Sequence, residues 1–268
     1  MKMNTREMRI DLMRMGLAAK SAGAHLGGSL SLVEVMAALY GRVMTFDPAN
    51  PQAENRDRLI FSKGHGVMAQ YVALKQIGVL TEEEILTYKA SGSVVSAHPS
   101  VHQARLGIDF ASGSLGQGLS QGVGVALALR RKHNGSSRVF VILGDGECDE
   151  GSVWEATAAA AHYGLTNLIA IVDQNQLQYD GPTEKVLDLA DLAAKWKAFG
   201  WEAVSVDGHD IEAIASACGT VSERPLAIIA KTVKGKGVSF MENVPAWHHG
   251  VVTQKVFEQA MAELEARP

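Results

Sequence analysis

Apolar positions along the chain follow two periods, one typical of buried strands and one typical of helices. Nearly continuous apolar runs, bounded by glycine or polar residues, occupy residues 138–143 (RVFVIL) and 167–173 (NLIAIVD). Runs of this kind are typical of strands that are buried on both faces of a parallel sheet. Shorter runs predict three more strands, at residues 58–61, 202–206 and 226–231.

Apolar residues at helical spacing separate these strands. In the first segment, residues 5–21, Met8, Leu12 and Met15 recur on one helical face. The same spacing predicts helices at residues 67–77, 116–130, 152–163, 187–199 and 211–218, and one beginning at residue 253. Two S/T-x-x-E sequences, at residues 31–34 and 81–84, are typical of capping boxes and predict two further helix starts.

The order of these elements predicts the fold class. Strands alternate with helices, which indicates an α/β fold built on a doubly wound parallel sheet with helices on both faces. There is no internal repeat, low-complexity tract or flexible linker, so we expect a single domain over residues 1–268. Ligands of such sheets bind at the carboxyl ends of the strands, so the residues that follow each strand form the candidate site.

Composition and charge argue against several function classes. The 268 residues are 47% hydrophobic, which allows a sizeable core. A net charge of -4, without a basic tail, argues against nucleic acid and anionic membrane partners. The chain has no run of 18 apolar residues, and its charged N-terminal segment is unlike a secretory signal. Two cysteines cannot form a disulfide framework, so we expect a cytoplasmic location.

Oxygen-bearing side chains follow two of the predicted strands. Gly144-Asp145-Gly146 comes directly after the strand at residues 138–143, and Asn175 follows the strand at residues 167–173. If the strands are neighbours, Asp145 and Asn175 can offer oxygen ligands to one hard cation such as Mg²⁺. An Asp-Gly turn alone is common loop chemistry, but the 28 residues between Gly146 and Asn175 make the pair more specific.

This spacing resembles the thiamine diphosphate signature, and the surrounding residues resemble its transketolase version. The resemblance rests on GDGECDEG at residues 144–151 and on DQNQLQYDG at residues 173–181. It implies thiamine diphosphate as cofactor, with Mg²⁺ or another divalent cation such as Ca²⁺ or Mn²⁺. The implied metal ligands are Asp145, Asn175 and the backbone carbonyl of Leu177, and Gly144, Gly146 and Glu147 are implied to contact the cofactor. Gln174 departs from the commoner Asp or Asn, but it precedes the ligating position.

A second glycine-rich segment, residues 112–118, opens the predicted helix at residues 116–130. Backbone N–H groups at a helix N-terminus attract phosphate, and glycine permits close approach, although close helix packing is an alternative explanation. A similar Gly-x-Leu-Gly-Gln-Gly segment lies beside the cofactor in transketolases. The resemblance therefore implies that Ser114, Leu115 and Gly116 contact it, with Ser114 standing where proline is usual.

Four histidines lie in glycine- or proline-rich loops, where a backbone can approach a ligand closely. They are His25, His65, His98 and His248. A single histidine is more often a loop or core residue, but an imidazole can also donate, accept or relay a proton near neutral pH. The resemblance implies that these four are catalytic and surround the thiazolium ring and the first hydroxyl groups of a sugar.

Other residues in these segments have less specific signals. The resemblance places Lys63, Lys234 and His249 near the cofactor, although a solvated basic loop would explain the lysines equally well. It also places Glu150 and Glu155 at a dimer interface between active sites, whereas carboxylates at a helix start are ordinary. The remaining histidines are expected to be structural or solvated, and His209 to shape a turn and cap a helix: these are His102, His133, His162 and His209.

The resemblance covers only the first domain of a transketolase. Such enzymes obtain the activating carboxylate and the aminopyrimidine pocket from a second domain, for which this chain has no counterpart. We therefore expect the N-terminal subunit of a split transketolase, inactive alone. In an α2β2 assembly it would pair with a C-terminal pyrimidine-domain subunit. It would move a two-carbon ketol unit from a ketose, or ketose phosphate, to an aldose through a thiamine diphosphate adduct.

Three alternatives remain open at this point. Another thiamine enzyme, such as a 1-deoxyxylulose-5-phosphate synthase or the α chain of a 2-oxo-acid dehydrogenase, has a similar domain, although the loop histidines favour sugar handling. A non-catalytic, cofactor-binding regulatory subunit need not retain Asp145, Asn175 and the histidines. A nucleotide-binding α/β protein is disfavoured because G-x-x-x-x-G-K-[ST] is absent from the sequence.

Overall fold

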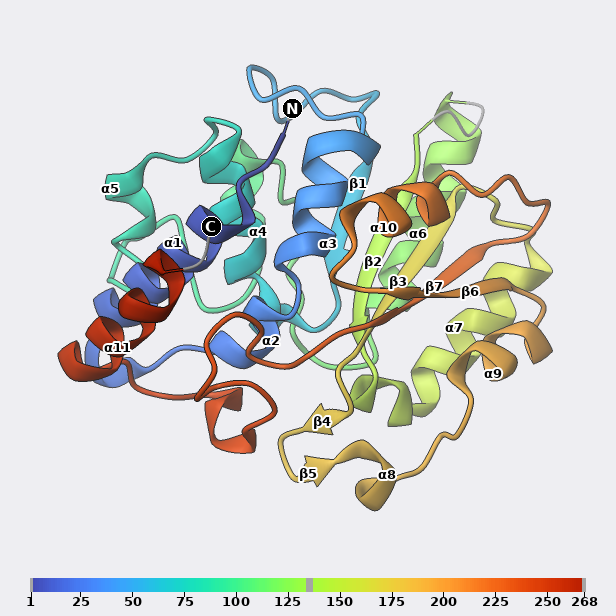
Figure 1. The fold of residues 1–268 in the computed structure, drawn as a ribbon. Helices are drawn as coiled ribbons and strands as arrows, with labels where there is room; N and C mark the ends of the chain where they lie inside the picture. Colours follow the sequence, from blue (N-terminus) through green and yellow to red (C-terminus); the bar gives the residue numbers. More distant parts are fainter. Residues whose placement is uncertain (1, 134–136, 267–268) are drawn as a thin grey trace.

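The predicted parallel sheet is present in the computed structural model, which describes residues 2–133 and 137–266 (Figure 1). Its strand order is β1-β2-β3-β7-β6, and each neighbouring pair is parallel. The strands are β1 (Arg58–Phe61), β2 (Val139–Gly144), β3 (Leu168–Gln174), β6 (Glu202–Asp207) and β7 (Leu226–Lys231). All five strands that the apolar runs predict are therefore confirmed.

Side chains of each strand alternate between two hydrophobic cores, one on each face of the sheet. On β2, Phe140 and Ile142 enter one core, while Val139 and Val141 enter the other. The first core is completed by α1 (Thr5–Ala18), α3 (Val33–Ala38), α4 (Met68–Gln76), α10 (Ile211–Cys218) and α11 (Gln254–Glu265). The second is completed by α6 (Gly118–His133), α7 (Gly151–His162) and α9 (Leu192–Ala198). Helices thus cover both faces, and the expected fold class is confirmed (Figure 1).

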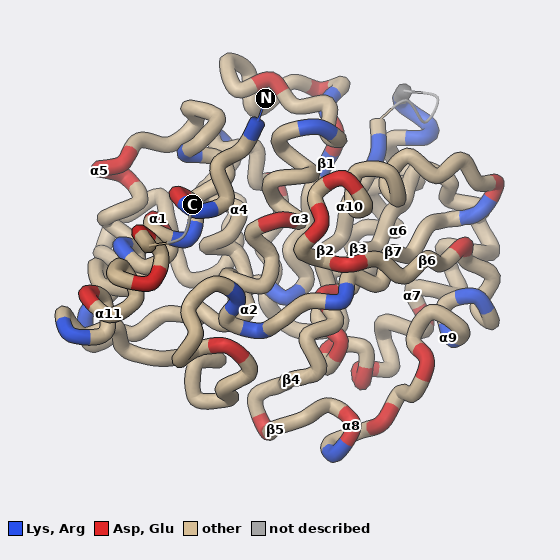
Figure 2. The backbone as a smooth tube through the Cα atoms, in the orientation of Figure 1, with Lys and Arg blue, Asp and Glu red and all other residues tan. Residues whose placement is uncertain are grey.

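The short elements lie mainly around the carboxyl edge of the sheet. They are α2 (Leu26–Leu30), α8 (Thr183–Val186) and a small antiparallel hairpin of β4 (Leu177–Gln178) and β5 (Gly181–Pro182), whereas α5 (Glu82–Ile85) packs beside α4 away from that edge. Figure 1 shows the hairpin and α8 projecting beyond the ends of the central strands. Basic and acidic residues are interspersed over the elements (Figure 2). No helix within the described ranges is long and apolar enough to span a bilayer.

Strand register brings the loops of the candidate site to one edge. Gly144 at the end of β2 pairs with Asp173 of β3, and Gln174 pairs with Lys231 at the end of β7. The segment after β7 then reaches α2, where the Gly235 N–H donates to the carbonyl of Gly27. Loops far apart in the sequence therefore meet where the strands end.

The predicted capping box at residues 31–34 is wrong, whereas the one at residues 81–84 is confirmed. Leu32 occupies the cap position of α3 without a side-chain bond. The Ser31 hydroxyl instead donates to Asp173, and Glu34 pairs with Arg9. Partners from distant segments thus take the side chains that local spacing assigns to a cap.

Two other local predictions need correction. The helix predicted at residues 187–199 begins only at Leu192, because Asp191 caps it. His209 does not cap α10; Asp210 accepts from the N–H groups at its start. His209 Nδ1 instead lies 2.9 Å from a carboxylate oxygen of Glu34. His209 is therefore a structural residue, as the sequence predicts, although it is not a cap.

Candidate functional site

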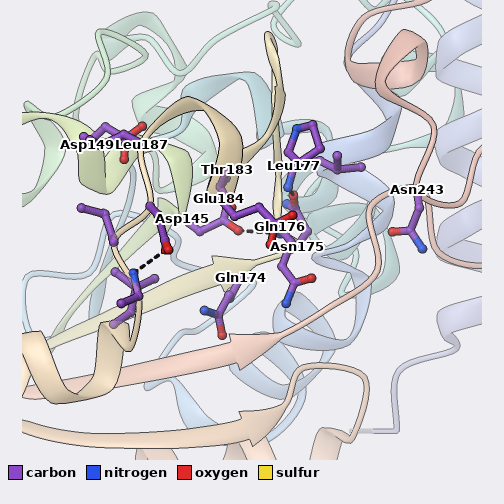
Figure 3. Close-up of a pocket in the computed structure, with 15 residues that line it drawn as sticks. Asp145, Asp149, Gln174, Asn175, Gln176, Leu177, Thr183, Glu184, Leu187 and Asn243 are labelled. Carbon is purple, nitrogen blue, oxygen red and sulfur yellow. Dashed lines mark hydrogen bonds between the residues drawn. The ribbon is translucent and has the colours of Figure 1, made fainter.

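Two loops meet through Asp145 at the carboxyl edge of the sheet. Its carboxylate accepts hydrogen bonds from the N–H groups of Gly146, at 2.9 Å, and Gln176, at 2.6 Å. The second bond crosses from the loop after β2 to the loop after β3 (Figure 3). In that second loop, the side-chain oxygen of Asn175 accepts from the Leu177 N–H at 3.1 Å. Asp145 and Asn175 therefore border the same space, as their positions after neighbouring strands predict.

The oxygen donors of these loops fit a hard divalent cation. Burial, together with the nearby Asp173 carboxylate, raises the pKa of Asp145 to about 6, so a bound cation would stabilise its charged form. The Asn175 amide oxygen and the Leu177 carbonyl are further oxygen donors of the type that Mg²⁺ prefers. Among the described residues, no group of three or more His, Cys, Asp or Glu could hold a metal ion. A metal ion here would thus depend on amide and carbonyl oxygens as well as on one carboxylate.

A cavity of about 290 Å³ opens beside the two loops. Most of the residues that the sequence singles out line it: Lys63, His65, Leu115, Gly144, Asp145, Gly146, Glu147, Glu150, Asn175, Leu177, Lys234 and His248. Two of them are buried lysines, whose ammonium groups can donate hydrogen bonds to the oxygens of a diphosphate. A second cavity, of about 450 Å³, is lined by the loop after β3 and by residues 182–192 (Figure 3).

Lys234 connects the metal-loop side of the cavity to the histidine side. Its Nζ donates to the Leu177 carbonyl at 2.7 Å and lies 3.1 Å from Nδ1 of His248. Burial and the neighbouring Lys63 lower the pKa of Lys234 to about 8. A buried ammonium group in this place can bind a phosphate oxygen while it orients the His248 ring.

Five histidines from separate loops gather at the other end of the cavity. The His25 ring lies at the centre, with ring centroids 4.5 to 5.9 Å from those of His65, His98, His248 and His249. His65 and His248 also approach one another, at 5.0 Å. The structure thus brings together all four histidines expected to be catalytic, and it places His249 beside them.

The histidines of this cluster are held in the neutral form at pH 7. Burial and the adjacent His249 and His248 lower the pKa of His25 to about 3. Burial and Lys234 lower the pKa of His248 to about 4, and burial and Lys63 lower the pKa of His65 well below its usual value. A neutral imidazole has both a donor and an acceptor nitrogen, so the cluster can hold hydroxyl groups and relay protons.

Comparison with known proteins identifies the family to which this geometry belongs. Residues 4–264 match the family described as "Transketolase, thiamine diphosphate binding domain". The chain belongs to the transketolase family. The expected identity and the thiamine diphosphate cofactor are therefore confirmed, and the catalytic class of the family is that of a thiamine-dependent transferase.

Two similar transketolase chains have nearly the same length as this one. One subunit of an apulose-4-phosphate transketolase from Phocaeicola vulgatus is 40% identical over 251 residues, which cover 92% of this chain and 88% of that protein. One subunit of a 6-deoxy-6-sulfo-D-fructose transketolase from Clostridium sp. is 44% identical over 244 residues, covering 90% and 88%. Both proteins are thus named as parts of larger transketolases.

Longer transketolases match over one part of their length. The human transketolase is 37% identical over 264 residues, which cover 98% of this chain and 42% of that protein. The crystal structure of a Pichia stipitis transketolase in complex with sedoheptulose-7-phosphate has a TM-score of 0.88 at 30% identity, covering 97% of this chain and 40% of that chain. The chain thus spans about two fifths of the length of these transketolases.

Within this transketolase site, Glu147 lines the cavity and is also held by hydrogen bonds within the protein. Both of its oxygens accept hydrogen bonds within the protein: one from the Ser62 hydroxyl and the Gly116 N–H, the other from the Gly144 N–H. Glu147 therefore holds the glycine-rich segment at residues 112–118 against the ends of β1 and β2. It shapes the wall of the cavity in this way, and its predicted contact with the cofactor stays a prediction.

The remaining predicted residues lie around the cavity rather than in its wall. Gly116 is buried behind Glu147, and Ser114 is exposed in the preceding turn. Glu155 is exposed on α7, so its predicted place at a dimer interface stays a prediction. His98 and His249 are exposed at the outer edge of the histidine cluster.

Sequence reasoning missed two residues that the fold brings into this transketolase site. Tyr179, which is 72% exposed, places its ring 5.4 Å from that of His248 in an edge-on contact. Asp173 is fully buried and pairs with Lys63. Its signal was an aspartate at the end of an otherwise apolar strand, a position where burial requires a partner.

Proposed function

We propose that this chain is the diphosphate- and metal-binding subunit of a two-chain transketolase, one domain over residues 1–268. The observation that carries the proposal is the cavity that joins the oxygen donors Asp145 and Asn175 to the histidine cluster. A metal-anchored diphosphate at one end would place the reactive part of the cofactor near the histidines. When bound, thiamine diphosphate supplies the nucleophilic carbon that attacks the carbonyl group of a ketose.

The metal ion is Mg²⁺ or a similar divalent cation held by Asp145, Asn175 and the Leu177 carbonyl. The buried ammonium group of Lys234 would complement the charge of the diphosphate, and Lys63, whose charge is balanced by Asp173, would donate a hydrogen bond to it. These five residues bind and orient the cofactor and do not take part in bond breaking.

The histidines bind the sugar and move protons. His25, His65, His98 and His248 form one cluster whose depressed pKa values keep the rings neutral. Each ring can donate a hydrogen bond to the developing alkoxide or accept one from a sugar hydroxyl. The cluster would thus stabilise the charge that develops when the C2–C3 bond of the ketose breaks.

The substrates are a ketose donor and an aldose acceptor, and the donor carries an anionic group. The proteins similar over nearly their whole length are named for an apulose phosphate and a sulfofructose, both of which carry such a group. Their names also describe subunits, which supports a partner chain. We propose that this partner carries the pyrimidine-binding domain and that the assembly is α2β2. Two free, buried cysteines, Cys148 and Cys218, suit a reducing cytoplasm.

A reconstitution assay tests this function. The chain is assayed alone and with its pyrimidine-domain partner, using a ketose phosphate with an aldose acceptor and, separately, pyruvate. We expect two-carbon transfer only in the two-chain mixture and no decarboxylation of pyruvate. Full activity of the chain alone, or activity with pyruvate instead of the ketose, would refute the proposal.

A matched pair of histidine variants tests the role of the cluster in the same assay. His25→Ala removes the central ring, so turnover should fall by about 100-fold or more, the usual contribution of a proton-transfer group. His162→Ala changes an exposed histidine at the end of α7 and should leave turnover unchanged. Equal turnover of the two variants would show that the histidine cluster does not take part in catalysis.

A further inference from the structure

Asp173, near the end of β3, accepts hydrogen bonds from four segments of the chain. The side chain is fully buried. One carboxylate oxygen accepts from the Ser31 hydroxyl at 2.7 Å, from Asn175 Nδ2 at 2.9 Å and from the Lys63 ammonium group. The other oxygen accepts from the Thr232 hydroxyl. Asp173 therefore joins the turn before α3, the end of β1, the loop after β3 and the loop after β7.

The contact with Asn175 fixes which end of its amide faces the metal loops. An amide has a nitrogen and an oxygen of similar shape, and only hydrogen bonds decide how it is oriented. Here Nδ2 donates to Asp173, while Oδ1 accepts from the Leu177 N–H. The second lone pair of Oδ1 is then left for a cation, whereas a flipped amide would present N–H groups to it.

Asp173 can do this without competing for the cation itself. The Lys63 ammonium group forms a buried ion pair with one of its carboxylate oxygens, and the Thr232 hydroxyl donates to the other. The charge of Asp173 is thus balanced by Lys63. Its hydrogen bonds are directed at neighbouring side chains rather than into the cavity.

We propose that Asp173 is a positioning residue that holds the Asn175 amide with its oxygen toward the cation bound beside Asp145. The inference rests on the proposed function, because Asn175 ligates a metal ion only there. Asp173 would thus orient a metal ligand, whereas Asp145, Asn175 and Leu177 would contact the metal ion directly. Groups that orient metal ligands commonly change metal affinity by about 10- to 100-fold.

Binding of Mn²⁺ to the full chain in the presence of thiamine diphosphate, followed by electron paramagnetic resonance, tests the proposal. Asp173→Asn should weaken Mn²⁺ affinity by at least about tenfold. Asp11→Asn is the matched control. Asp11 lies on α1, is equally buried, and has both carboxylate oxygens 2.8 Å from Nζ of Lys75 on α4. Both variants should melt at a lower temperature, but only Asp173→Asn should lose Mn²⁺ affinity. Equal Mn²⁺ affinities of the two variants would overturn the proposal.

An exchange of the two side chains tests the hydrogen bond directly and does not need the metal ion. Asn175→Asp alone sets two carboxylates against each other, and Asp173→Asn alone leaves Lys63 without its counterion. In the double variant, an amide at position 173 can donate to a carboxylate at position 175. It should therefore melt at a higher temperature than either single variant, even if Asp173→Asn alone does not fold. A double variant that does not melt above the more stable of the two single variants contradicts the proposed contact.

Asp145→Ala separates this inference from the proposed function. If Asp145→Ala leaves Mn²⁺ binding intact, the metal site itself is wrong. If Asp145→Ala abolishes binding while Asp173→Asn binds normally, the site stands and only the positioning role of Asp173 falls.

Discussion

Removal of the Glu147 carboxylate should loosen the wall of the cofactor cavity. In Glu147→Ala, the N–H groups of Gly116 and Gly144 lose acceptors that lie 2.8 and 3.1 Å away, and the Ser62 hydroxyl loses its partner. Each buried donor left without an acceptor costs about 1–3 kcal/mol, so the two N–H groups together cost about 2–6 kcal/mol. Burial raises the pKa of Glu147, so relief of a buried charge offsets part of this cost.

The expected result is a lower melting temperature together with weaker cofactor binding. For a domain of this size, a loss of about 2–4 kcal/mol lowers the melting temperature by roughly 5–15 °C. Binding of thiamine diphosphate should weaken as well, because the segment at residues 112–118 loses its anchor. Circular dichroism melting and calorimetric titration measure the two effects.

A conservative variant and an exposed control make the result specific. Glu147→Gln keeps an oxygen for Ser62 and Gly116 but sets an N–H group against that of Gly144, so its loss should be intermediate. Glu223→Ala changes an exposed glutamate outside the site and should shift neither quantity. If Glu147→Ala melts within about 2 °C of the wild type, roughly the effect of 1 kcal/mol or less, the three bonds do not hold the loop.

Two further predictions concern the histidines and the packing of the glycine-rich segment. Because the folded pKa values of His25 and His248, about 3 and 4, lie below the unfolded value near 6.5, their contribution to stability is complete above pH 6.5 and is lost as the pH falls toward 4. After about half is discounted for partial exposure, the slope is roughly 0.7 kcal/mol per pH unit for each ring. Urea unfolding profiles of the wild type and of the double variant His25→Asn/His248→Asn should therefore differ in slope by roughly 1.4 kcal/mol per pH unit between pH 4.5 and 6.5. Parallel profiles would contradict this prediction. Gly64→Ala would place a methyl group 2.7 Å from the Gly113 backbone, so it should weaken the binding of thiamine diphosphate measured by calorimetry. Gly151→Ala should not weaken binding, because the added carbon meets nothing within 4 Å. Equal affinities of the two variants would show that the close approach of Gly64 to Gly113 is dispensable.

The sheet could be predicted from the sequence because its strands are apolar runs that enter two cores. The hairpin of β4 and β5 could not, because each strand has only two residues and no detectable period. Ser31 and Glu34 show a different limit. Their spacing is that of a capping box, yet their partners, Asp173 and Arg9, lie 142 and 25 residues away in sequence.

The residues of the candidate site likewise fall into those that the sequence could predict and those that depend on distant contacts. Asp145 and Asn175 could be paired in advance, because residues that follow neighbouring parallel strands share one edge of the sheet. The resemblance to transketolases predicted which histidines belong to the site, but only the structure shows that the His25 ring lies at the centre of the cluster. Neither source could assign Glu147 to the cavity wall, because that depends on which way the side chain turns.

The central claim is that oxygens from two strand-end loops hold the metal ion that anchors the diphosphate. Calorimetric titration of thiamine diphosphate into the two-chain assembly, with Mg²⁺ present, measures this most directly. The Asp145→Ala/Asn175→Ala variant should bind the cofactor more than about tenfold less tightly than the wild type. Asp188→Ala, which changes a carboxylate of the other, 450 Å³ cavity, should bind it normally. Unchanged affinity in the double variant would contradict the claim.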